Sequence, residues 1–325
     1  MKTTTKIEFQ NTFEKEVYEG LTAFPKRLSS KWFYDKKGDK LFQKIMELPE
    51  YYLTSYEYNI IEKHQQEIGK LFDEPQGFDL VELGAGDGKK TKILLEKFYE
   101  ENLEFTYRPI DISASVLEEL EESIQEKWPQ LDIQTEQGMY FDVLKKLGNR
   151  DTARKMVIMV LGSNIGNLTH PQAIDFLVNI RKSMQPEDLL FMGLDQKKDP
   201  QQILNAYNDT QEITAEFNKN ILRRINTELD SNFNTEAFKH WPVYDPETGT
   251  AKSFLVSTTQ QKVTLKKLNI EVNFAPWESI HTEISQKYDD DVVQWLAQEA
   301  GLEITAQFSD TQKQFTDYAF KRKAE

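Results

Sequence analysis

The segment FDLVELGAGDGKKT, residues 78–91, constrains the fold more than any other part of the chain. A short apolar run ends in three closely spaced glycines, and KILLEKFYEE follows with apolar residues at helical spacing. Strand, glycine turn and helix in this order are typical of the first unit of an open α/β sheet. We therefore expect Gly84, Gly86 and Gly88 at the carboxyl end of a strand, where such sheets bind ligands.

The same alternation of strand and helix recurs further along the chain. FTYRPIDIS predicts a second strand, SASVLEELEESIQEKW an amphipathic helix with Ser113 or Ser115 as its N-cap, and LDIQTEQG another strand-like piece. KMVIMVLGSNIGN, HPQAIDFLVNIRKSM and DLLFMGLD then repeat strand, helix and strand. This alternation predicts a parallel sheet with helices on both faces.

The alternation stops after Asp195, which indicates an insertion. Residues 196–287 contain polar helical text and TAKSFLVSTTQQKVTLKKLNIEVNF, which predicts an antiparallel pair of strands. The last segment restores helix, strand, turn and strand. We therefore expect a discontinuous α/β domain over 57–195 plus 288–325, and a second, smaller α+β domain over 1–56 plus 196–287.

Composition excludes several classes of function. The 325 residues contain no cysteine, so a disulfide scaffold, a cysteine-ligated zinc site, an iron–sulfur cluster and thiol catalysis are excluded. The four histidines are widely separated, and we expect no metal site. The formal net charge of −14 argues against a nucleic-acid partner, because such binding needs Lys and Arg to neutralise phosphates.

The sequence also argues against a membrane partner. The N-terminus has no apolar segment of signal-peptide length, and the most apolar run, 156–161, is too short to span a bilayer. We expect a cytoplasmic protein.

The glycine turn fits neither of two common phosphate-binding patterns. Both G-x-G-x-x-G and G-x-x-x-x-G-K-[ST], started at Gly84, fail because Lys89 stands where a glycine belongs. What remains is E-x-G-x-G with Asp111 at the end of the second strand, where a carboxylate can bind both ribose hydroxyls of an adenosine. Two alternatives stay open: the turn merely connects strand and helix, or Asp111 is an acidic N-cap.

This E-x-G-x-G…D pattern resembles the class I S-adenosylmethionine-dependent methyltransferases. The C-terminal segment, with a helix, AGLEI and a strand pair ending in YAFKRK, is similar to the reversed hairpin of those enzymes. The resemblance implies a Rossmann-like seven-stranded sheet that binds S-adenosyl-L-methionine.

A closer resemblance rests on KWFYDKKGDKLFQKIMELPEYYLTSYE, VELGAGDGKKTKILL, YRPIDIS, LGSNIGN, AYNDTQEITAEFNKNIL and HTEISQKY. In this order and spacing they resemble the histidine-specific N-alpha-methyltransferases of ergothioneine biosynthesis, from about residue 25 to the end. The resemblance implies methylation of the α-amino nitrogen of L-histidine, up to the trimethylated betaine hercynine, with 1–56 plus 196–287 as the substrate-binding domain. That family also includes fungal members acting on other aromatic amino acids.

The resemblance implies a set of cofactor-binding residues. Lys90 would pair with the methionine carboxylate of S-adenosylmethionine and Asp111 with its ribose. Tyr34, whose family counterpart lies near the substrate amino group, is the candidate catalytic residue, because it or a water could relay the amino proton. The residues that match cofactor contacts of the family are Tyr34, Gly84, Gly86, Lys90, Asp111 and Gly162.

A second set matches the residues around the substrate amino acid. Asn167 and Tyr207 would hold its carboxylate, Tyr51 would lie beside it, and Glu283 and Ser285 would hydrogen-bond the imidazole. A carboxylate and a hydroxyl can satisfy both ring nitrogens, whereas an indole has a single donor and would leave a buried group unpaired at about 1–3 kcal/mol. This favours histidine over tryptophan.

Each of these residues also has a purely structural interpretation. Tyr51 and Tyr207 could be core tyrosines, Asn167 a turn residue, and Glu283 with Ser285 a solvent-facing strand pair. We expect three further aromatic residues to belong to the core rather than to a ligand site: Phe33, Phe217 and Trp277.

Two positions depart from the family pattern. Met139 stands where family members usually have an acid that meets the adenine amino group, so the adenine contact would rest on backbone and Tyr140. Ser253 stands where a pocket methionine is common, which makes that wall smaller and more polar. The alternatives to a histidine methyltransferase are therefore a methyltransferase of another aromatic amino acid or histidine-containing amine, and a non-catalytic S-adenosylmethionine-binding module. We expect a monomer acting on a small amino acid.

Overall fold

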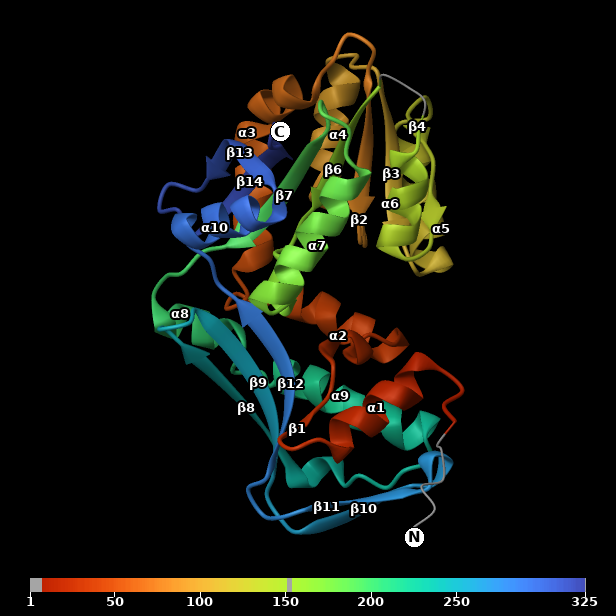
Figure 1. The fold of residues 1–325 in the computed structure, drawn as a ribbon, viewed down its shortest axis with the longest axis vertical. Coiled ribbons are helices and arrows are strands. Elements are labelled where there is room, and N and C mark those ends of the chain that lie inside the picture. The colour runs from red at the N-terminus through yellow and green to blue at the C-terminus, as the bar shows by residue number, and fades with distance from the viewer. Residues whose placement is uncertain (1–7, 151–153, 325) are drawn as a thin grey trace. The chain divides into compact units, whose positions relative to one another are not determined.

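A computed structural model of the chain describes residues 8–150 and 154–324 (Figure 1). The chain forms two compact units, each assembled from separate stretches of sequence. The small unit contains residues up to Tyr52 and Lys198–Ser285, and the large unit contains Leu53–Lys197 and the residues from Gln286 onward. The divisions fall after residues 52, 197 and 285, where the sequence predicted 56, 195 and 287.

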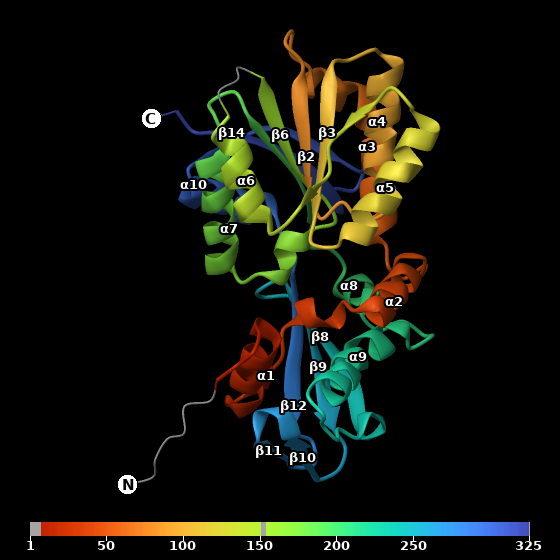
Figure 2. The same ribbon diagram turned by 90° about the vertical axis from the view of Figure 1, so that its right-hand side faces the viewer.

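The large unit is built on a mixed sheet of strand order β13-β14-β7-β6-β2-β3-β4, whose strands are labelled in Figure 1. Figure 2 shows β14, β6, β2 and β3 of this sheet in the view turned by 90°. The central strands are parallel, and β14 joins β7 antiparallel and pairs with β13, so the C-terminal hairpin completes the sheet as predicted. The strands are β2 (Phe78–Leu83), β3 (Phe105–Asp111), β4 (Asp132–Ile133), β6 (Lys155–Val160), β7 (Leu189–Asp195), β13 (Leu302–Ser309) and β14 (Phe315–Arg322).

One detail of this sheet differs from the prediction of seven strands. LDIQTEQG, expected as one strand, splits into β4 and a separate β5 (Glu136–Gln137), so eight strands are present in the described residues. Both short strands pair with β3, β4 through Thr106 and Tyr107 and β5 through Ile110 and Asp111. The break between them places β5 beside the carboxyl end of β3.

Helices cover both faces of the large unit's sheet. The face covered by α6, α7 and α10 buries Leu144, Leu177 and Leu296 against strand residues such as Ile158. On the other face α3, α4 and α5 bury residues such as Phe72. The helices are α3 (Leu53–Phe72), α4 (Thr91–Glu100), α5 (Ala114–Lys127), α6 (Tyr140–Gly148), the 3-10 turn η2 (Asn164–Asn167), α7 (His170–Ser183) and α10 (Asp290–Ala300).

The apolar runs noted in the sequence explain this two-faced burial. All six residues of β6 and all seven of β7 are buried, as expected for strands with a helical layer on each side. Ser113 is confirmed as the N-cap of α5, since its side chain accepts a hydrogen bond from Val116 N. At the end of β7, Asp195 forms a fully buried ion pair of 2.7 Å with Lys287, which ties the returning chain to the sheet.

The small unit combines a four-stranded sheet of order β1-β12-β9-β8 with a separate β10-β11 hairpin. Phe13 and Val17 of α1 and Ile221 of α9 pack with Leu255 and Ile280 of the sheet. Its elements are α1 (Thr12–Thr22), β1 (Lys26–Arg27), η1 (Ser30–Phe33), α2 (Lys36–Met46), α8 (Pro200–Ala206), α9 (Ile213–Glu228), η3 (Thr235–Ala237), β8 (Phe238–Asp245), β9 (Thr250–Ser257), β10 (Gln261–Leu265), η4 (Lys266–Leu268), β11 (Ile270–Phe274) and β12 (Ser279–Gln286).

Two expectations for the inserted segment need correction. The text from Thr250 to Phe274, predicted as one antiparallel pair, forms three strands: β9 pairs with β8, and only β10 and β11 form the pair. Trp277, expected in the core, is 72% exposed at a positive φ of 70° in the turn before β12. The expectation holds for Phe33 and Phe217, which are both buried.

A helix needs about 20 predominantly apolar residues to cross a bilayer. Within residues 8–150 and 154–324, no helix is long and apolar enough to do so.

Candidate functional site

The glycine turn after β2 forms a cradle at the carboxyl edge of the large sheet. Gly84, Gly86 and Gly88 all have positive φ, at 73°, 54° and 64°, which side chains other than glycine rarely adopt. A Cβ at Gly84 would lie 2.6 Å from Tyr140 Oη, and one at Gly88 would lie 2.6 Å from Leu120 Cδ1. A Cβ at Gly86 would meet nothing within 4 Å. The outer glycines therefore serve packing, whereas the backbone of Gly86 faces open space that a ligand can approach.

Glu82, the acid of the E-x-G-x-G pattern, lies beneath this cradle rather than in it. It is buried and accepts hydrogen bonds from Tyr107 Oη and, at 2.7 Å, from Thr91 Oγ1. Burial raises the pKa of Glu82 to about 7 against the lowering effect of these bonds. Its geometry assigns it a structural role, which is to join β2, β3 and the start of α4 below the turn.

Asp111 ends β3, next to the cradle along the sheet edge. It is half-buried, and its Oδ1 accepts a hydrogen bond of 3.0 Å from Ser113 N. Because Ser113 caps α5, the alternative that Asp111 is the N-cap is wrong. The carboxylate stands where the hydroxyls of a ribose can be bound.

Met139 and Tyr140 follow β5, which pairs with the end of β3. Met139 is 66% exposed, and Tyr140 is half-buried with its hydroxyl over Gly84. Burial, together with the nearby carboxylates of Asp111 and Glu82, raises the pKa of Tyr140 to about 12. Tyr140 is therefore a neutral donor at the rim of the cradle.

Lys90 and Gly162 meet over a buried carboxylate. Gly162, with φ 82°, follows β6, and a Cβ there would lie 3.5 Å from Lys90 Nζ. Glu57, fully buried on α3, bonds to Lys90 Nζ and accepts from Gly162 N at 2.9 and 2.8 Å. Among the predicted cofactor residues, the large unit thus brings Gly84 close to Tyr140 and Gly162 close to Lys90. It adds Glu57, which no sequence pattern singled out. Asn167 ends η2 in the same connection and is exposed.

In the small unit, β9 and β12 carry a polar group of predicted substrate residues. Tyr207, which follows α8, is buried and donates a hydrogen bond of 2.7 Å to Ser285 Oγ. Ser253 Oγ donates to Glu283 Oε2 at 3.4 Å. Thus Ser253, which the sequence noted only as a departure, contacts one of the predicted imidazole-binding residues. Tyr207 is buried, as its structural interpretation predicts, and its hydroxyl also contacts Ser285, the other predicted imidazole-binding residue.

Tyr34 and Tyr51 belong to an aromatic cluster of the same unit. The Tyr34 ring, 41% exposed, packs edge-on against Phe217 at 5.3 Å and Phe42 at 5.5 Å between centroids. Phe42 also contacts Tyr51 at 6.2 Å. The sequence did not select Phe42, although its place between WFYD and PEYY allows it to support both tyrosines.

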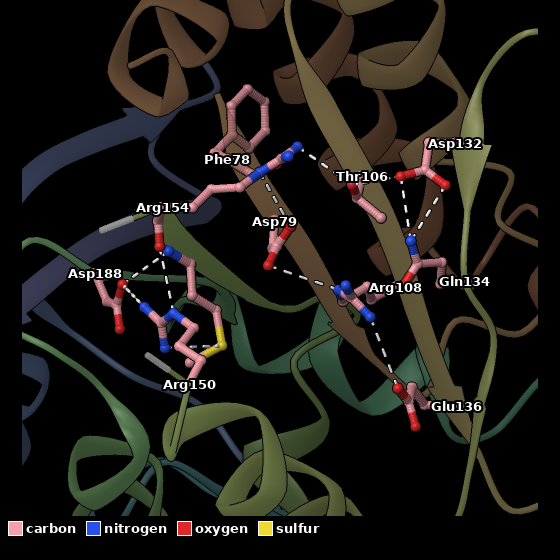
Figure 3. Close-up of polar contacts among 11 residues, drawn as sticks. Phe78, Asp79, Thr106, Arg108, Asp132, Gln134, Glu136, Arg150, Arg154 and Asp188 are labelled. Atoms are coloured by element: carbon pink, nitrogen blue, oxygen red, sulfur yellow. Dashed lines mark hydrogen bonds and ion pairs between the residues drawn. The ribbon is translucent and has the colours of Figure 1, made fainter. Parts of the chain in front are cut away.

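A second group of charged residues lies at the opposite, amino edge of the large sheet (Figure 3). Asp79 near the start of β2 pairs with Arg108 and Arg154, at 3.6 and 3.2 Å. Asp188, just before β7, binds Arg150 and accepts a 2.7 Å hydrogen bond from Met156 N. The group borders a cavity of about 280 Å³. Ligands of open α/β sheets bind at the carboxyl edge. We therefore assign these charged residues a structural role, which is to hold together the first residues of neighbouring strands.

Comparison with known proteins agrees with this geometry. Residues 13–322 match the family described as histidine-specific, S-adenosylmethionine-dependent methyltransferases. A histidine N-alpha-methyltransferase of Mycolicibacterium smegmatis is 37% identical over 91% of this chain and 90% of its own length. One from Mycobacterium tuberculosis is 33% identical over 89% and 88%. A 4-dimethylallyltryptophan N-methyltransferase of Epichloe festucae var. lolii is 30% identical over 61% and 60%.

The family match spans both units, from α1 to the last strand, and a relative above 30% identity covers nine-tenths of the chain. The glycine cradle, Asp111 and the antiparallel β14 are the features expected of a class I methyltransferase. The chain belongs to the histidine-specific, S-adenosylmethionine-dependent methyltransferases.

Proposed function

We propose that this enzyme methylates the α-amino nitrogen of L-histidine, up to the trimethylated betaine hercynine. The observation that carries the proposal is the pair Glu283 and Ser285 on β12, with Ser285 held by Tyr207, on a chain that matches histidine methyltransferases along its length. A carboxylate and a hydroxyl at alternate strand positions offer an acceptor and a donor to the two nitrogens of one imidazole.

The large unit has the residue types that S-adenosylmethionine requires. The open space over Gly86 fits close approach of a ligand to backbone, Lys90 offers an ammonium to the methionine carboxylate, and Asp111 offers acceptors to the ribose. Tyr140 and the backbone beside Met139 would contact the adenine. When bound, the cofactor supplies an electrophilic methyl group.

The remaining substrate contacts are assigned by type. Asn167 would bind the substrate carboxylate, with Tyr51 beside it. Tyr207, also predicted to hold this carboxylate, donates its single O–H to Ser285 in this structure, and so would act through Ser285. A neutral amide and a phenol can hold a carboxylate without placing a nucleophilic amine beside a methyl donor. Positioning and exclusion of water would supply most of the rate enhancement.

Tyr34 is the proposed proton relay. The substrate ammonium must lose a proton before its nitrogen can act as a nucleophile. Tyr34 is 41% exposed, and its ring packs against the partly buried Phe42 and the buried Phe217, which fix its position. Either the Tyr34 hydroxyl or a water bound by it would pass the proton outward.

Mass spectrometry of amino acids incubated with enzyme and S-adenosylmethionine tests the proposal. We expect histidine to gain one, two and three methyl groups. The panel includes tryptophan, tyrosine and a histidine-containing peptide. No mass gain on histidine together with gain on another amine would overturn the choice of substrate.

A second candidate is methylation of another aromatic amino acid. It is favoured by Ser253, whose contact with Glu283 makes the wall more polar than a methionine would, and by the similarity to a tryptophan-derivative methyltransferase. Turnover on no amine at all, with retained cofactor binding, would instead indicate a binding module.

The proposal further holds that the enzyme acts as a cytoplasmic monomer on a small amino acid, without a nucleic-acid partner. The net charge of −14 supports the last point, because polyanions would be repelled. Light scattering coupled to size exclusion tests the monomer, which a mass of twice 38.0 kDa would exclude.

A further inference from the structure

Two carboxyl groups meet in the interior of the large unit without a donor between them. Glu57 on α3 and Asp317 on β14 are both fully buried. They meet at Gly193 of β7, where a Cβ would lie 1.9 Å from Glu57 Oε1 and 2.7 Å from Asp317 Oδ1. The missing side chain of Gly193 therefore makes the space that both carboxyl groups occupy.

The two carboxyl groups differ in their partners. Glu57 accepts from the N–H of Gly162 and from the ammonium of Lys90. Neither carboxyl oxygen of Asp317 receives a hydrogen bond from any residue that the structure describes. A buried carboxylate without donors that faces a second carboxylate is strongly unfavourable unless a proton lies between them. The proton therefore belongs on Asp317, and the negative charge belongs on Glu57.

The charged groups around this pair support the assignment. Burial raises the pKa of Asp317 well above its usual range, the charge of Glu57 raises it further, and Lys90 opposes both. Glu82 on β2 is the other carboxyl group influenced by Glu57 and Lys90. Glu57 comes from α3, Asp317 from β14, Glu82 from β2 and Lys90 from the turn before α4, while β7 faces the pair with the uncharged Gly193.

We propose that Glu57 is a positioning residue of the cofactor site, which fixes Lys90 and the Gly162 turn while protonated Asp317 donates to it. The inference rests on the proposed cofactor role of Lys90. The pair carries one negative charge, which matches the one positive charge of Lys90. Lys90 and the Gly162 N–H are thereby held in place before a ligand binds. The conformational entropy of these groups is therefore lost during folding and not during ligand binding.

A double-mutant cycle on cofactor binding tests the positioning role. Isothermal titration with S-adenosylhomocysteine is measured for the intact wild-type chain and for Glu57→Gln, Lys90→Met and the double variant. We expect each single change to raise Kd about tenfold and the double variant to bind no more weakly than Lys90→Met alone, because contacting residues are coupled. Additive losses would overturn the proposal.

The position of the proton has its own test. Because the folded-state pKa of Asp317 is raised, its stabilising contribution is present at low pH and is lost as pH rises through that pKa. Asp317→Asn mimics the protonated acid, so the fall of Tm with rising pH should flatten in this variant. An unchanged slope would place the proton elsewhere.

Infrared spectroscopy of the Glu82→Gln chain covers the case in which Glu57→Gln fails to fold. This variant removes the other buried carboxyl group, whose pKa is raised to about 7. A protonated buried carboxyl band that persists at neutral pH in the ligand-free variant then belongs to the pair, and its absence would overturn the shared proton. None of these measurements uses histidine. If they succeed while histidine is not methylated, the proposed substrate fails and the cofactor inference stands.

Discussion

The phenol of Tyr207 donates its proton to the hydroxyl of Ser285 over 2.7 Å, so Ser285 acts as the acceptor in this contact. A hydroxyl whose lone pair is engaged by one donor directs its own proton toward another acceptor. Ser285 is thereby oriented as a donor, and its strand neighbour at alternate spacing, Glu283, is an acceptor. The two roles match the acceptor and donor nitrogens of a neutral imidazole.

Tyr207→Phe should weaken histidine use without affecting the cofactor. Loss of one neutral hydrogen bond costs about 1 kcal/mol, so kcat/KM for histidine should fall about fivefold. Steady-state kinetics provides the measurement, with Ser285→Ala and the double variant as the control cycle. If affinity for S-adenosylhomocysteine fell by the same factor, Tyr207 would not be acting through Ser285.

Glu283→Gln should change the choice of substrate. Hydrogen bonds to a charged group contribute about 1.5–3 kcal/mol, so kcat/KM for histidine should fall roughly ten- to 150-fold, with smaller losses on tryptophan. The matched control is Thr282→Val on the same strand. Its hydroxyl donates to Asn218 at 2.8 Å in the buried interior, so this variant should lower Tm and leave the substrate ratio unchanged. Equal losses on all amino acids would contradict the assignment of Glu283.

Gly84 and Gly86 of the cradle should respond differently to alanine. Gly84→Ala places a Cβ 2.6 Å from Tyr140 Oη, so it should lower Tm, and Tyr140→Phe in the same chain should recover part of that loss. Gly86→Ala meets no neighbour within 4 Å, so its cost is the positive φ, about 1 kcal/mol. It should nevertheless raise Kd for S-adenosylhomocysteine, because the methyl group enters the ligand's space. Thermal melts measure the change in Tm, and calorimetry measures the change in Kd. If Gly86→Ala bound S-adenosylhomocysteine as tightly as the wild-type chain, the cofactor would bind elsewhere.

Glu82 should make stability depend on pH near neutrality. Its pKa rises from 4.5 to about 7 on folding, so the folded state holds the proton more tightly than the unfolded chain. Its contribution to stability is complete below pH 4.5 and is lost as pH rises through 7, by roughly 3 kcal/mol of unfolding free energy. Glu82→Gln should flatten this part of the curve, as measured by denaturant unfolding between pH 5 and 8. A steeper slope in the variant would show that Glu82 is charged when folded.

Met139→Asp should strengthen cofactor binding. The side chain is 66% exposed at the start of α6, so an acid there has little desolvation cost and stands at a favourable helix N-terminus. If the adenine amino group lies beside it, Kd for S-adenosylhomocysteine should fall several-fold. Met139→Asn is the control for charge. Weaker binding of the acidic variant would show that this chain binds adenine in a different way.

Local sequence patterns predicted most of the large unit, because the spacing of apolar residues and the glycine turns mark where its strands and helices lie. The apolar runs of β6 and β7, the cap at Ser113 and the closing β14 follow from that text. The split of β4 from β5 does not, since it depends on which residues of β3 each short strand pairs with. The prediction that Trp277 lies in the core was wrong for a related reason. Its exposure is decided by the geometry of the turn before β12 and not by its aromatic character.

In the candidate site, too, local patterns predicted some residues, while others could be found only from contacts in the folded chain. The glycines and Asp111 could be found from motif and spacing. Glu57 could not, because in EYNIIEKH it resembles any acid on a helix, and its role appears only when Lys90, Gly162 and Asp317 meet it in space. The contact between Ser253 and Glu283 likewise depends on two strands placed side by side in a sheet.

The division of the chain after residues 197 and 285 has a consequence for how this enzyme can be altered. Tyr207, Ser253, Glu283 and Ser285 are encoded in one uninterrupted stretch, while the glycine cradle and Asp111 lie outside it. Exchange of this single stretch with that of a relative should therefore alter the proposed contacts to the substrate side chain. It would leave the glycine cradle, Asp111 and two further proposed substrate residues, Tyr51 and Asn167, unchanged.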